Sequence, residues 1–385
     1  KHLFRTHLHE YGSVVRARSV HISDVDKKDF AAALGALHKE NLLVIDRDSR
    51  KGTTAIYEPF AYQVERDSAR LLKERIEDAD LDHDAEGTYE YLEKLAAFGP
   101  KTEEAAKEGD LAHTVSVVVQ EWASHSKINL SDKQKEGVRN ALRHPVSVLT
   151  GLPGTGKTTS LKAAVRVLQD AEVRFLLCAP TGIAAKRLSS MTGADAFTIH
   201  RAFGAQGSSS EGRESTYAGI VGSSEGSTSN EDHSEWKYSG TNFHPAQVVI
   251  IDEASMVDQH LLYRLLDGTN PSCRLVFVGD HAQLPSVGPG NVLRELIQSE
   301  LFPVVKLTEI FRQEDTSDIV YAAHDIHKGE VPSITTKGDF ALVQTDSDSK
   351  AMEVVCTLAN RLFEGNQRAT DPEDKVDFQL SLIHI

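Results

Sequence analysis

The N-terminal part of the chain shows a helical pattern of apolar residues followed by two strand-like runs. Phe30, Leu34 and Leu37 recur at the spacing of one helix face. The runs NLLVID (41–46) and TTAIYEP (53–59) favour two strands, which the polar turn RDSRKG joins. This order predicts a winged-helix-like module, and a small packing domain without nucleic-acid contact is the open alternative.

The next segment changes from a helical pattern to an acidic one. Residues 60–77 are predicted to form another helix, and the stretch EDADLDHDAEG that follows is typical of a solvated linker. We therefore predict an N-terminal domain over residues 1–120, helical and winged-helix-like, that contains this acidic linker.

Beyond residue 120, short β-rich runs alternate with helical segments. The runs are VSVLT, VRFLLCA, VVIIDE, CRLVFVGD and VVKLTE. Their alternation with helices predicts an α/β fold over residues 121–308, with a parallel sheet and flanking helices. A Ser- and Gly-rich stretch, 205–235, carries six acidic residues and one arginine, and we expect it to be a flexible insertion.

Composition and charge narrow the class of protein. The 385 residues are 40% hydrophobic, and the longest apolar runs are far shorter than the roughly 20 residues that span a bilayer. Three widely separated cysteines favour a reducing compartment, so we expect a cytoplasmic protein without a membrane partner. The net charge of -15 disfavours a nucleic-acid partner, but one groove can still gather basic side chains.

A glycine-rich loop carries the first specific chemistry. The stretch VLTGLPGTGKTTS (148–160) lies between a predicted strand and a predicted helix, which is the context of a phosphate-binding loop. Backbone N–H groups of such a loop surround the phosphates, Lys157 supplies a positive charge, and Thr158 is a ligand for Mg²⁺. The predicted ATP-binding residues of the loop are Gly151, Pro153, Gly154, Thr155, Gly156, Lys157, Thr158 and Thr159.

Two adjacent carboxylates follow the apolar strand VVII. We expect Asp252 to hold the Mg²⁺ ion and Glu253 to take a proton from the attacking water. Both residues would lie at the carboxyl edge of the sheet, together with the phosphate loop. Because an enzyme that transfers phosphate to a metabolite needs no such base, Glu253 favours ATP hydrolysis.

Three further motifs carry a specific resemblance. They are DEASM (252–256), GDHAQLP (279–285) and LTEIFRQ (307–313). With the phosphate loop, they resemble the helicase core of superfamily one and, within it, the RecD-like branch. UvrD-like and Pif1-like helicases differ at these places. The resemblance covers most of residues 125–330 and implies a RecA-like P-loop NTPase motor domain.

The resemblance implies roles for polar residues outside the loop. Gln134 falls where the family reads the adenine, and an exposed glutamine at a helix start is the alternative. Gln283 would sense the γ-phosphate and couple it to the DNA groove. Arg312 resembles the arginine finger that stabilises charge on the transferred phosphoryl group, with a surface salt bridge as its alternative. The implied catalytic residues are Lys157, Glu253, Gln283 and Arg312.

The same resemblance places single-stranded DNA against two segments, CAPTGIAAKRL (178–188) and TIHRAFG (198–204). Lys186 and Arg187 also fit an ordinary charged helix surface. The segment EWKYSGTNFHP (235–245) would supply part of a hairpin that splits the duplex. The implied phosphate or sugar contacts are Thr181, Lys186 and His200.

Residues 309–379 resemble the start of a second RecA-like domain. A strand and a helix are predicted over 338–365, but two further motifs of such a domain are absent from the sequence, so we expect the domain to be truncated. The last six residues, LSLIHI (380–385), have no polar cap or turn and match one reading frame of a common transposase sequencing adapter. We interpret them as a sequencing artefact.

These features predict an ATP-dependent DNA helicase or translocase. The resemblance implies 5′ to 3′ movement on single-stranded DNA and DNA forks, in DNA repair or recombination, with ATP and Mg²⁺; nuclease or repair partners stay open. A P-loop protein that binds DNA without acting as a motor is one alternative, which DNA-stimulated ATP turnover would exclude. The helicase part of a conjugative relaxase is the other, and a Tyr/His nicking domain upstream would identify it.

Overall fold

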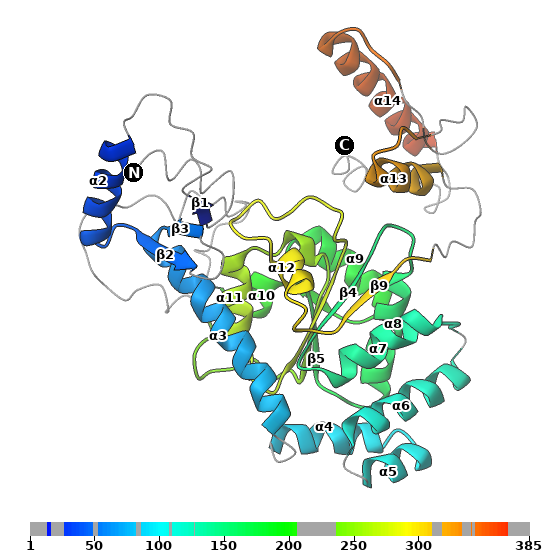
Figure 1. Ribbon diagram of the computed structural model, residues 1–385. Coiled ribbons are helices and arrows are strands. Elements are labelled where there is room, and N and C mark those ends of the chain that lie inside the picture. Colours follow the sequence, from blue (N-terminus) through cyan, green and yellow to red (C-terminus); the bar gives the residue numbers. More distant parts are fainter. Residues whose placement is uncertain are drawn as a thin grey trace. The chain divides into compact units, whose positions relative to one another are not determined.

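The computed structural model describes residues 14–16, 27–48, 53–81, 86–107, 110–126, 128–205, 236–309, 318–332, 340 and 343–368. The chain divides into two compact units, residues 1–311 and 312–385. The first unit contains a parallel sheet with helices on both faces (Figure 1).

Six parallel strands form this sheet, in the order β6-β5-β7-β8-β4-β9. The five longer strands coincide with the five predicted runs, and the RecA-like P-loop fold is confirmed. The sequence did not predict β6, because a strand of three residues is too short to show a period. The strand bounds are Val146–Gly151 for β4, Phe175–Ala179 for β5, Ala196–Thr198 for β6, Val248–Ile251 for β7, Arg274–Gly279 for β8 and Val304–Leu307 for β9.

Both faces of the sheet are buried. Val248 and Ile250 of β7 belong to one apolar cluster, and Val249 and Ile251 belong to the other. A strand that is covered on both faces reads as a continuous apolar run, as VVII does. The first face carries α7 (Asp132–Arg143), α8 (Lys157–Asp170) and α9 (Gly182–Thr192), and the second carries α10 (Ile199–Ala202), α11 (Gln259–Asp267) and α12 (Val292–Gln298).

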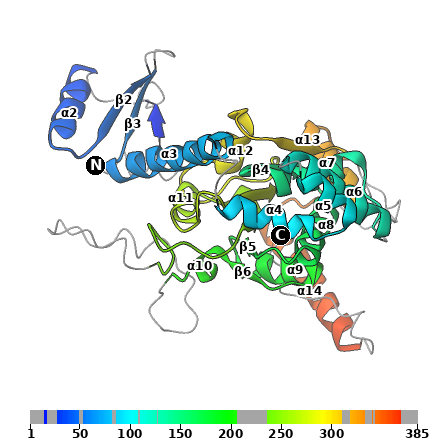
Figure 2. The same ribbon diagram turned by 90° about the horizontal axis from the view of Figure 1, so that it is seen from below.

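A long helix, α3 (Pro59–Leu81), packs along α11 (Figures 1 and 2). Leu71, Leu72 and Ile76 of α3 are partly buried against the second apolar cluster. The helix includes residues 77–81, so it continues into the acidic stretch where a linker was expected.

A small antiparallel sheet precedes α3. Helix α2 (Lys27–Lys39) is followed by a hairpin of β2 (Val44–Asp48) and β3 (Thr53–Tyr57), and β1 (Val14–Arg16) pairs with the other side of β3. The helix and the two strands that the sequence predicted are present in this order. The assignment of this module as winged-helix-like stays a prediction, and whether it contacts nucleic acid stays open.

Three helices join the N-terminal part to the α/β sheet: α4 (Glu86–Ala96), α5 (Pro100–Lys107) and α6 (Leu111–His125). Tyr91 of α4 and Trp122 of α6 are buried in the same apolar cluster as α7 and α8. The guanidinium of Arg274, the first residue of β8, lies 3.8 Å from the ring centroid of Tyr91. The boundary expected near residue 120 falls inside α6, which shares its core with the sheet.

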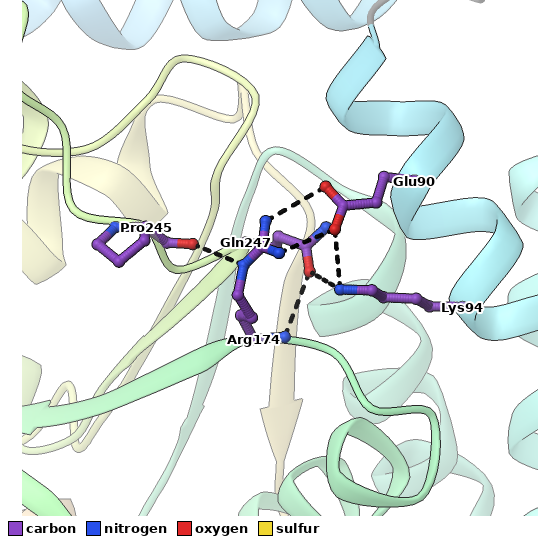
Figure 3. Close-up of polar contacts among 5 residues, drawn as sticks. All are labelled: Glu90, Lys94, Arg174, Pro245 and Gln247. Carbon is purple, nitrogen blue, oxygen red and sulfur yellow. Dashed lines mark hydrogen bonds and ion pairs between the residues drawn. The ribbon is translucent and has the colours of Figure 1, made fainter.

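A polar network ties α4 to the amino ends of β5 and β7 (Figure 3). The guanidinium of Arg174 donates to both carboxylate oxygens of Glu90, at 2.9 and 3.2 Å, and to the carbonyl oxygen of Pro245 at 3.2 Å. Gln247 Oε1 accepts from the backbone N–H of Arg174 and from Lys94 Nζ. Hydrogen bonds from Lys94 and Arg174 lower the pKa of Glu90. The network lies at the opposite edge of the sheet from the phosphate loop.

The described part of the second unit contains α13 (Asp318–Lys328) and α14 (Asp348–Arg368). The helix predicted in this region matches α14, whereas most of the preceding strand, like residues 380–385, lies outside the described residues. Within the parts of both units that the structure describes, no helix combines the length and the apolar character needed to cross a bilayer.

Candidate nucleotide site and basic groove

The glycine-rich loop connects the end of β4 to the start of α8. Gly154 and Gly156 have φ angles of 79° and 86°, which L side chains rarely adopt, so glycine is needed at both positions. Gly156 is the N-cap of α8, and no described side chain caps the first turn of that helix. The backbone N–H groups at this helix start therefore suit an anion such as a phosphate.

Gly151, the last residue of β4, is tightly enclosed. A Cβ atom at this position would lie 2.5 Å from Thr155 Oγ1 and 2.7 Å from the carbonyl oxygen of Leu307. Thr155 is itself buried, and its hydroxyl donates to the carbonyl oxygen of Leu152 at 2.8 Å. The loop is thus held closed by its own residues and by β9.

Lys157 is the first residue of α8 and folds back over the loop. Its ammonium group donates to the carbonyl oxygens of Gly151 and Leu152. Burial lowers the pKa of Lys157, and the carboxylates of Asp280, Glu253 and Asp252 oppose this shift. The structure therefore brings together Lys157 and the two carboxylates predicted to act with it, and adds Asp280.

Asp252 and Glu253 follow directly after β7. Burial, and next the charge of Glu253, raise the pKa of Asp252 to about 6. Glu253 has a φ angle of 53°, in the left-handed region that is uncommon for residues other than glycine. Such backbone conformations concentrate at active sites, where interactions of the surrounding structure offset their strain.

The donor set suits Mg²⁺ bound together with a nucleotide. Among the residues that the structure describes, no three His, Cys, Asp or Glu side chains gather to hold a metal ion. Mg²⁺ commonly takes one or two protein oxygens and completes its shell with phosphate oxygens and water. The hydroxyl of Thr158 at the start of α8 and the carboxylate of Asp252 match this sparse requirement.

Gln134 lies in a capping box at the start of α7. Its Oε1 accepts from the backbone N–H of Ser131 at 2.9 Å, and its Nε2 donates to the carbonyl oxygen of Gly156 at 3.4 Å. Only 3% of Gln134 is exposed, so the exposure expected in the alternative is wrong, whereas a structural role at a helix start is present as the capping box. Adenine recognition by Gln134 stays a prediction, and contact with the phosphate loop is the observed feature.

Gln283 lies in the turn that follows β8. Its Oε1 accepts from the hydroxyl of Ser255 at 3.3 Å, and Ser255 is two residues after Glu253. Asp280 is buried, and its carboxylate accepts from the backbone N–H of Ala282 at 2.9 Å. Asp280 and Ser255 belong to the motifs GDHAQLP and DEASM, but neither was predicted as a site residue from the sequence. Arg312 lies outside the described residues, so its predicted role stays a prediction.

A groove with a volume of about 490 Å³ lies between α9 and the β6–α10 segment. Two basic side chains line it. The resemblance implied Lys186 as a DNA contact, whereas Arg201 was not predicted from the sequence. The guanidinium of Arg201 also lies 5.4 Å from the ring centroid of Phe197. The complete lining is Gly182, Ala185, Lys186, Ser189, Ser190, Ala196, Phe197, Thr198 and Arg201.

The other implied DNA contacts flank this groove in the sequence. Thr181 is the N-cap of α9, and its hydroxyl accepts from the backbone N–H of Ala184 at 3.2 Å. His200 lies in α10, and its ring centroid is 5.5 Å from that of Trp236. Burial lowers the pKa of His200, which favours the neutral imidazole. Neither residue lines the groove directly.

Part of the predicted duplex-splitting hairpin is described. Ala205 and Trp236 form an antiparallel bridge, and so do Ser239 and Asn242. The bridge at Ala205 and Trp236 closes the base of the insertion, whose residues 206–235 lie outside the described part. The role of this segment on DNA stays a prediction.

The fold and the loop define the class, which is a RecA-like P-loop NTPase domain. A family model described as AAA domain matches residues 129–347, more than half of the chain, and the chain belongs to this family. The chain is 34% identical over 217 residues to the ATP-dependent RecD2 DNA helicase of Deinococcus radiodurans. The matched residues cover 55% of this chain and 26% of that protein. The RecD-like resemblance is confirmed.

The chain is also similar to a second RecD protein and to one solved structure. Over 178 residues the chain is 36% identical to the RecBCD enzyme subunit RecD of Haemophilus influenzae. The matched residues cover 44% of this chain and 26% of that protein. The crystal structure of the Pif1 helicase from Candida albicans covers 61% of this chain and 54% of that chain, with 24% identity and a TM-score of 0.38. The chain spans about a quarter of the length of the two RecD-like relatives.

Proposed function

We propose that this chain is the ATP-hydrolysing part of a DNA helicase that moves along single-stranded DNA. The observation that carries the proposal is that Lys157 folds back over the glycine-rich loop and is within electrostatic reach of the carboxylates of Asp280, Glu253 and Asp252. A site that only binds a nucleotide has no need of a carboxylate base at this position.

Four residues of the chain have separate proposed roles in ATP hydrolysis. Lys157 neutralises charge on the phosphates, and Glu253 accepts the proton of the attacking water. Thr158 and Asp252 would hold the Mg²⁺ ion. Mg²⁺·ATP, when bound, supplies the transferable phosphoryl group and the cation that polarises it. The RecD-like resemblance gives Arg312 the role of an arginine finger, which would stabilise charge on the transferred phosphoryl group.

Single-stranded DNA is the proposed substrate. Support comes from the names of the RecD-like relatives and from Lys186 and Arg201, which line one groove of an otherwise acidic chain. Two cations on one groove can contact successive phosphates despite a net charge of -15. Movement from 5′ to 3′ and a role in DNA repair or recombination belong to the same proposal and rest on the RecD-like resemblance.

The test uses the full-length protein that contains this chain. We expect single-stranded DNA to stimulate its ATP hydrolysis, and a duplex with a 5′ tail to be unwound in preference to one with a 3′ tail. Arg201→Gln should weaken DNA binding and reduce its salt dependence by about one counterion. Arg166→Gln, on the exposed surface of α8, is the matched control. An ATP hydrolysis rate that is the same with and without single-stranded DNA would refute the proposal. The protein would then bind nucleotide without motor function.

A further inference from the structure

Two side chains of the basic groove are brought together by the turn between β6 and α10 (Figure 2). Thr198, the last residue of β6, caps α10, and its hydroxyl accepts from the backbone N–H of Arg201 at 3.2 Å. Because a helical side chain leans toward the start of its helix, Arg201 leans back over the strand. Its guanidinium accordingly lies over the ring of Phe197, 5.4 Å from the ring centroid.

The two side chains are held in different ways. Phe197 is half-buried, because it packs against the second apolar cluster and also lines the groove. Arg201 is exposed, and its guanidinium makes no hydrogen bond or ion pair with any residue that the structure describes. The core therefore anchors the ring, and the ring supports the guanidinium at the wall of the groove.

The shape of the guanidinium allows two contacts at once. The group is flat, and its N–H donors lie in its plane. The edge of Arg201 can therefore donate to a DNA phosphate while its face stays available for a flat partner. Nucleobases stack on arginine planes and on aromatic side chains. Phe197 and Arg201 provide both kinds of surface in one groove.

The remaining lining of the groove suits a sugar–phosphate backbone beside such a base. Lys186 of α9 supplies a second cation, and hydroxyl groups come from Ser189, Ser190 and Thr198. None of the described residues that line the groove is acidic. The volume of about 490 Å³ is within the range of small-ligand sites, so it suits one nucleotide of a strand.

We propose that Phe197 and Arg201 form a stacking platform for one unpaired nucleobase and thereby make the groove selective for single-stranded over duplex DNA. The inference rests on the proposed function and assigns the origin of specificity within it. In a duplex each base is stacked and paired, so a side chain can reach its face only if the base is extruded. A single strand exposes its base faces, and the platform accepts every base because each has a π face.

The experiment compares two oligonucleotides of equal length and charge, oligo(dT) and the same backbone with every base removed. Fluorescence anisotropy measures their affinities for the full-length protein that contains this chain, without ATP and over a salt series. We expect the wild type to bind oligo(dT) more tightly than the abasic strand. Phe197→Ala and Arg201→Lys should each reduce this preference by about fivefold or more, the contribution of one stacked base.

Matched variants separate stacking from charge. Arg201→Lys keeps the charge but not the flat face, so its salt dependence should equal that of the wild type while its preference falls. Phe197→Tyr keeps an aromatic ring and should retain the preference. Arg166→Lys, on the exposed surface of α8, should leave both quantities unchanged. The affinity for a blunt duplex should match the wild type in every one of these variants.

The outcomes also distinguish this inference from the proposed function. Equal preferences in the wild type, Phe197→Ala and Arg201→Lys would overturn the platform and leave the helicase proposal standing. A wild type that binds both oligonucleotides alike would do the same. If the wild type binds neither oligonucleotide, the proposed function fails, and the platform fails with it. If melting curves show that Phe197→Ala is unfolded, the exposed Arg201→Lys alone decides the question.

Discussion

Arg75 of α3 donates to both oxygens of Thr269, at 2.8 Å to the carbonyl and 2.5 Å to the hydroxyl. Its guanidinium also donates to the carbonyl oxygens of Leu266, Asn270 and Cys273. These acceptors end α11 and lead into β8, the strand that ends next to Asp280. A single side chain from the N-terminal part therefore satisfies the backbone at a helix end of the NTPase domain.

Arg75→Met should destabilise the fold strongly. Arg75 is only 2% exposed, and its loss would leave several buried carbonyl oxygens without a donor. We expect the free energy of unfolding to fall by about 3–5 kcal/mol, measured by urea denaturation. Arg70→Met on the same helix removes an exposed pair with Glu74 and should cost about 0.5 kcal/mol or less. Equal effects of the two substitutions would contradict the role of Arg75.

This contact marks what the sequence could predict and what it could not. The five longer strands were predictable, because each is an apolar run of strand length between polar turns. Helix α3 was predicted over residues 60–77, but its attachment to α11 was not. Arg75 is one charged residue in a charge-rich helix, and its burial depends on residues nearly two hundred positions away.

The nucleotide site divides in the same way. Lys157, Asp252 and Glu253 were predictable, because a phosphate loop and a strand-end acidic pair are local patterns that carry their own chemistry. Arg201 was not, since its place in a groove depends on the neighbouring helix α9. Gln134 is intermediate. Its place at a helix start could be predicted from the sequence, whereas its contact with Gly156 depends on how two separate helices pack.

Gly151→Ala should weaken nucleotide binding with little change elsewhere. The added methyl group would collide with Thr155 and with the backbone of β9, so the loop would have to open. We expect at least about tenfold weaker binding of a fluorescent ATP analogue. Gly182→Ala is the control, because a Cβ there meets no described atom within 4 Å. Wild-type affinity of Gly151→Ala would show that the loop tolerates this change.

Lys157→Ala and Glu253→Gln should separate ATP binding from hydrolysis. Lys157→Ala removes the charge that neutralises the phosphates, so both ATP affinity and turnover should fall. Glu253→Gln keeps the shape of the side chain but cannot accept a proton, so the full-length variant should bind ATP and turn over about a hundredfold slower or worse. Single-turnover measurements at saturating ATP provide the comparison. Turnover of Glu253→Gln at the wild-type rate would remove Glu253 from the role of base.

Asp252→Asn should stabilise the protein in the absence of Mg²⁺, and more so at higher pH. The pKa of Asp252 is raised from 3.8 to about 6 on folding, so ionisation of this carboxyl opposes folding. The neutral side chain should gain up to about 3 kcal/mol at pH 8, and about half of that at pH 5. Thermal melting in EDTA measures the difference. Asp195→Asn, at an exposed position, is the control, and a gain that is the same at both pH values would contradict the assignment.

The acidic insertion between Ala205 and Trp236 offers a test of whether its charge affects DNA binding. Deleting residues 207–233 leaves Gln206, Ser234 and Glu235 between the two bridge residues, and a three-residue connection is a common hairpin length. The deletion removes five acidic residues and one arginine. A matched variant keeps the length and neutralises the acids by amide substitution at Glu211, Glu214, Glu225, Glu231 and Asp232.

If these acids repel incoming phosphates, both variants of the full-length protein should bind forked DNA more tightly than wild type at low salt. The gain should fade as salt rises, because exposed charges are screened beyond roughly 8 Å at physiological ionic strength. Fluorescence anisotropy over a salt series measures both effects. A gain in the deletion alone would indicate that bulk, not charge, limits access. Equal affinities of all three proteins at low salt would mean that the insertion is merely tolerated, as long surface loops often are.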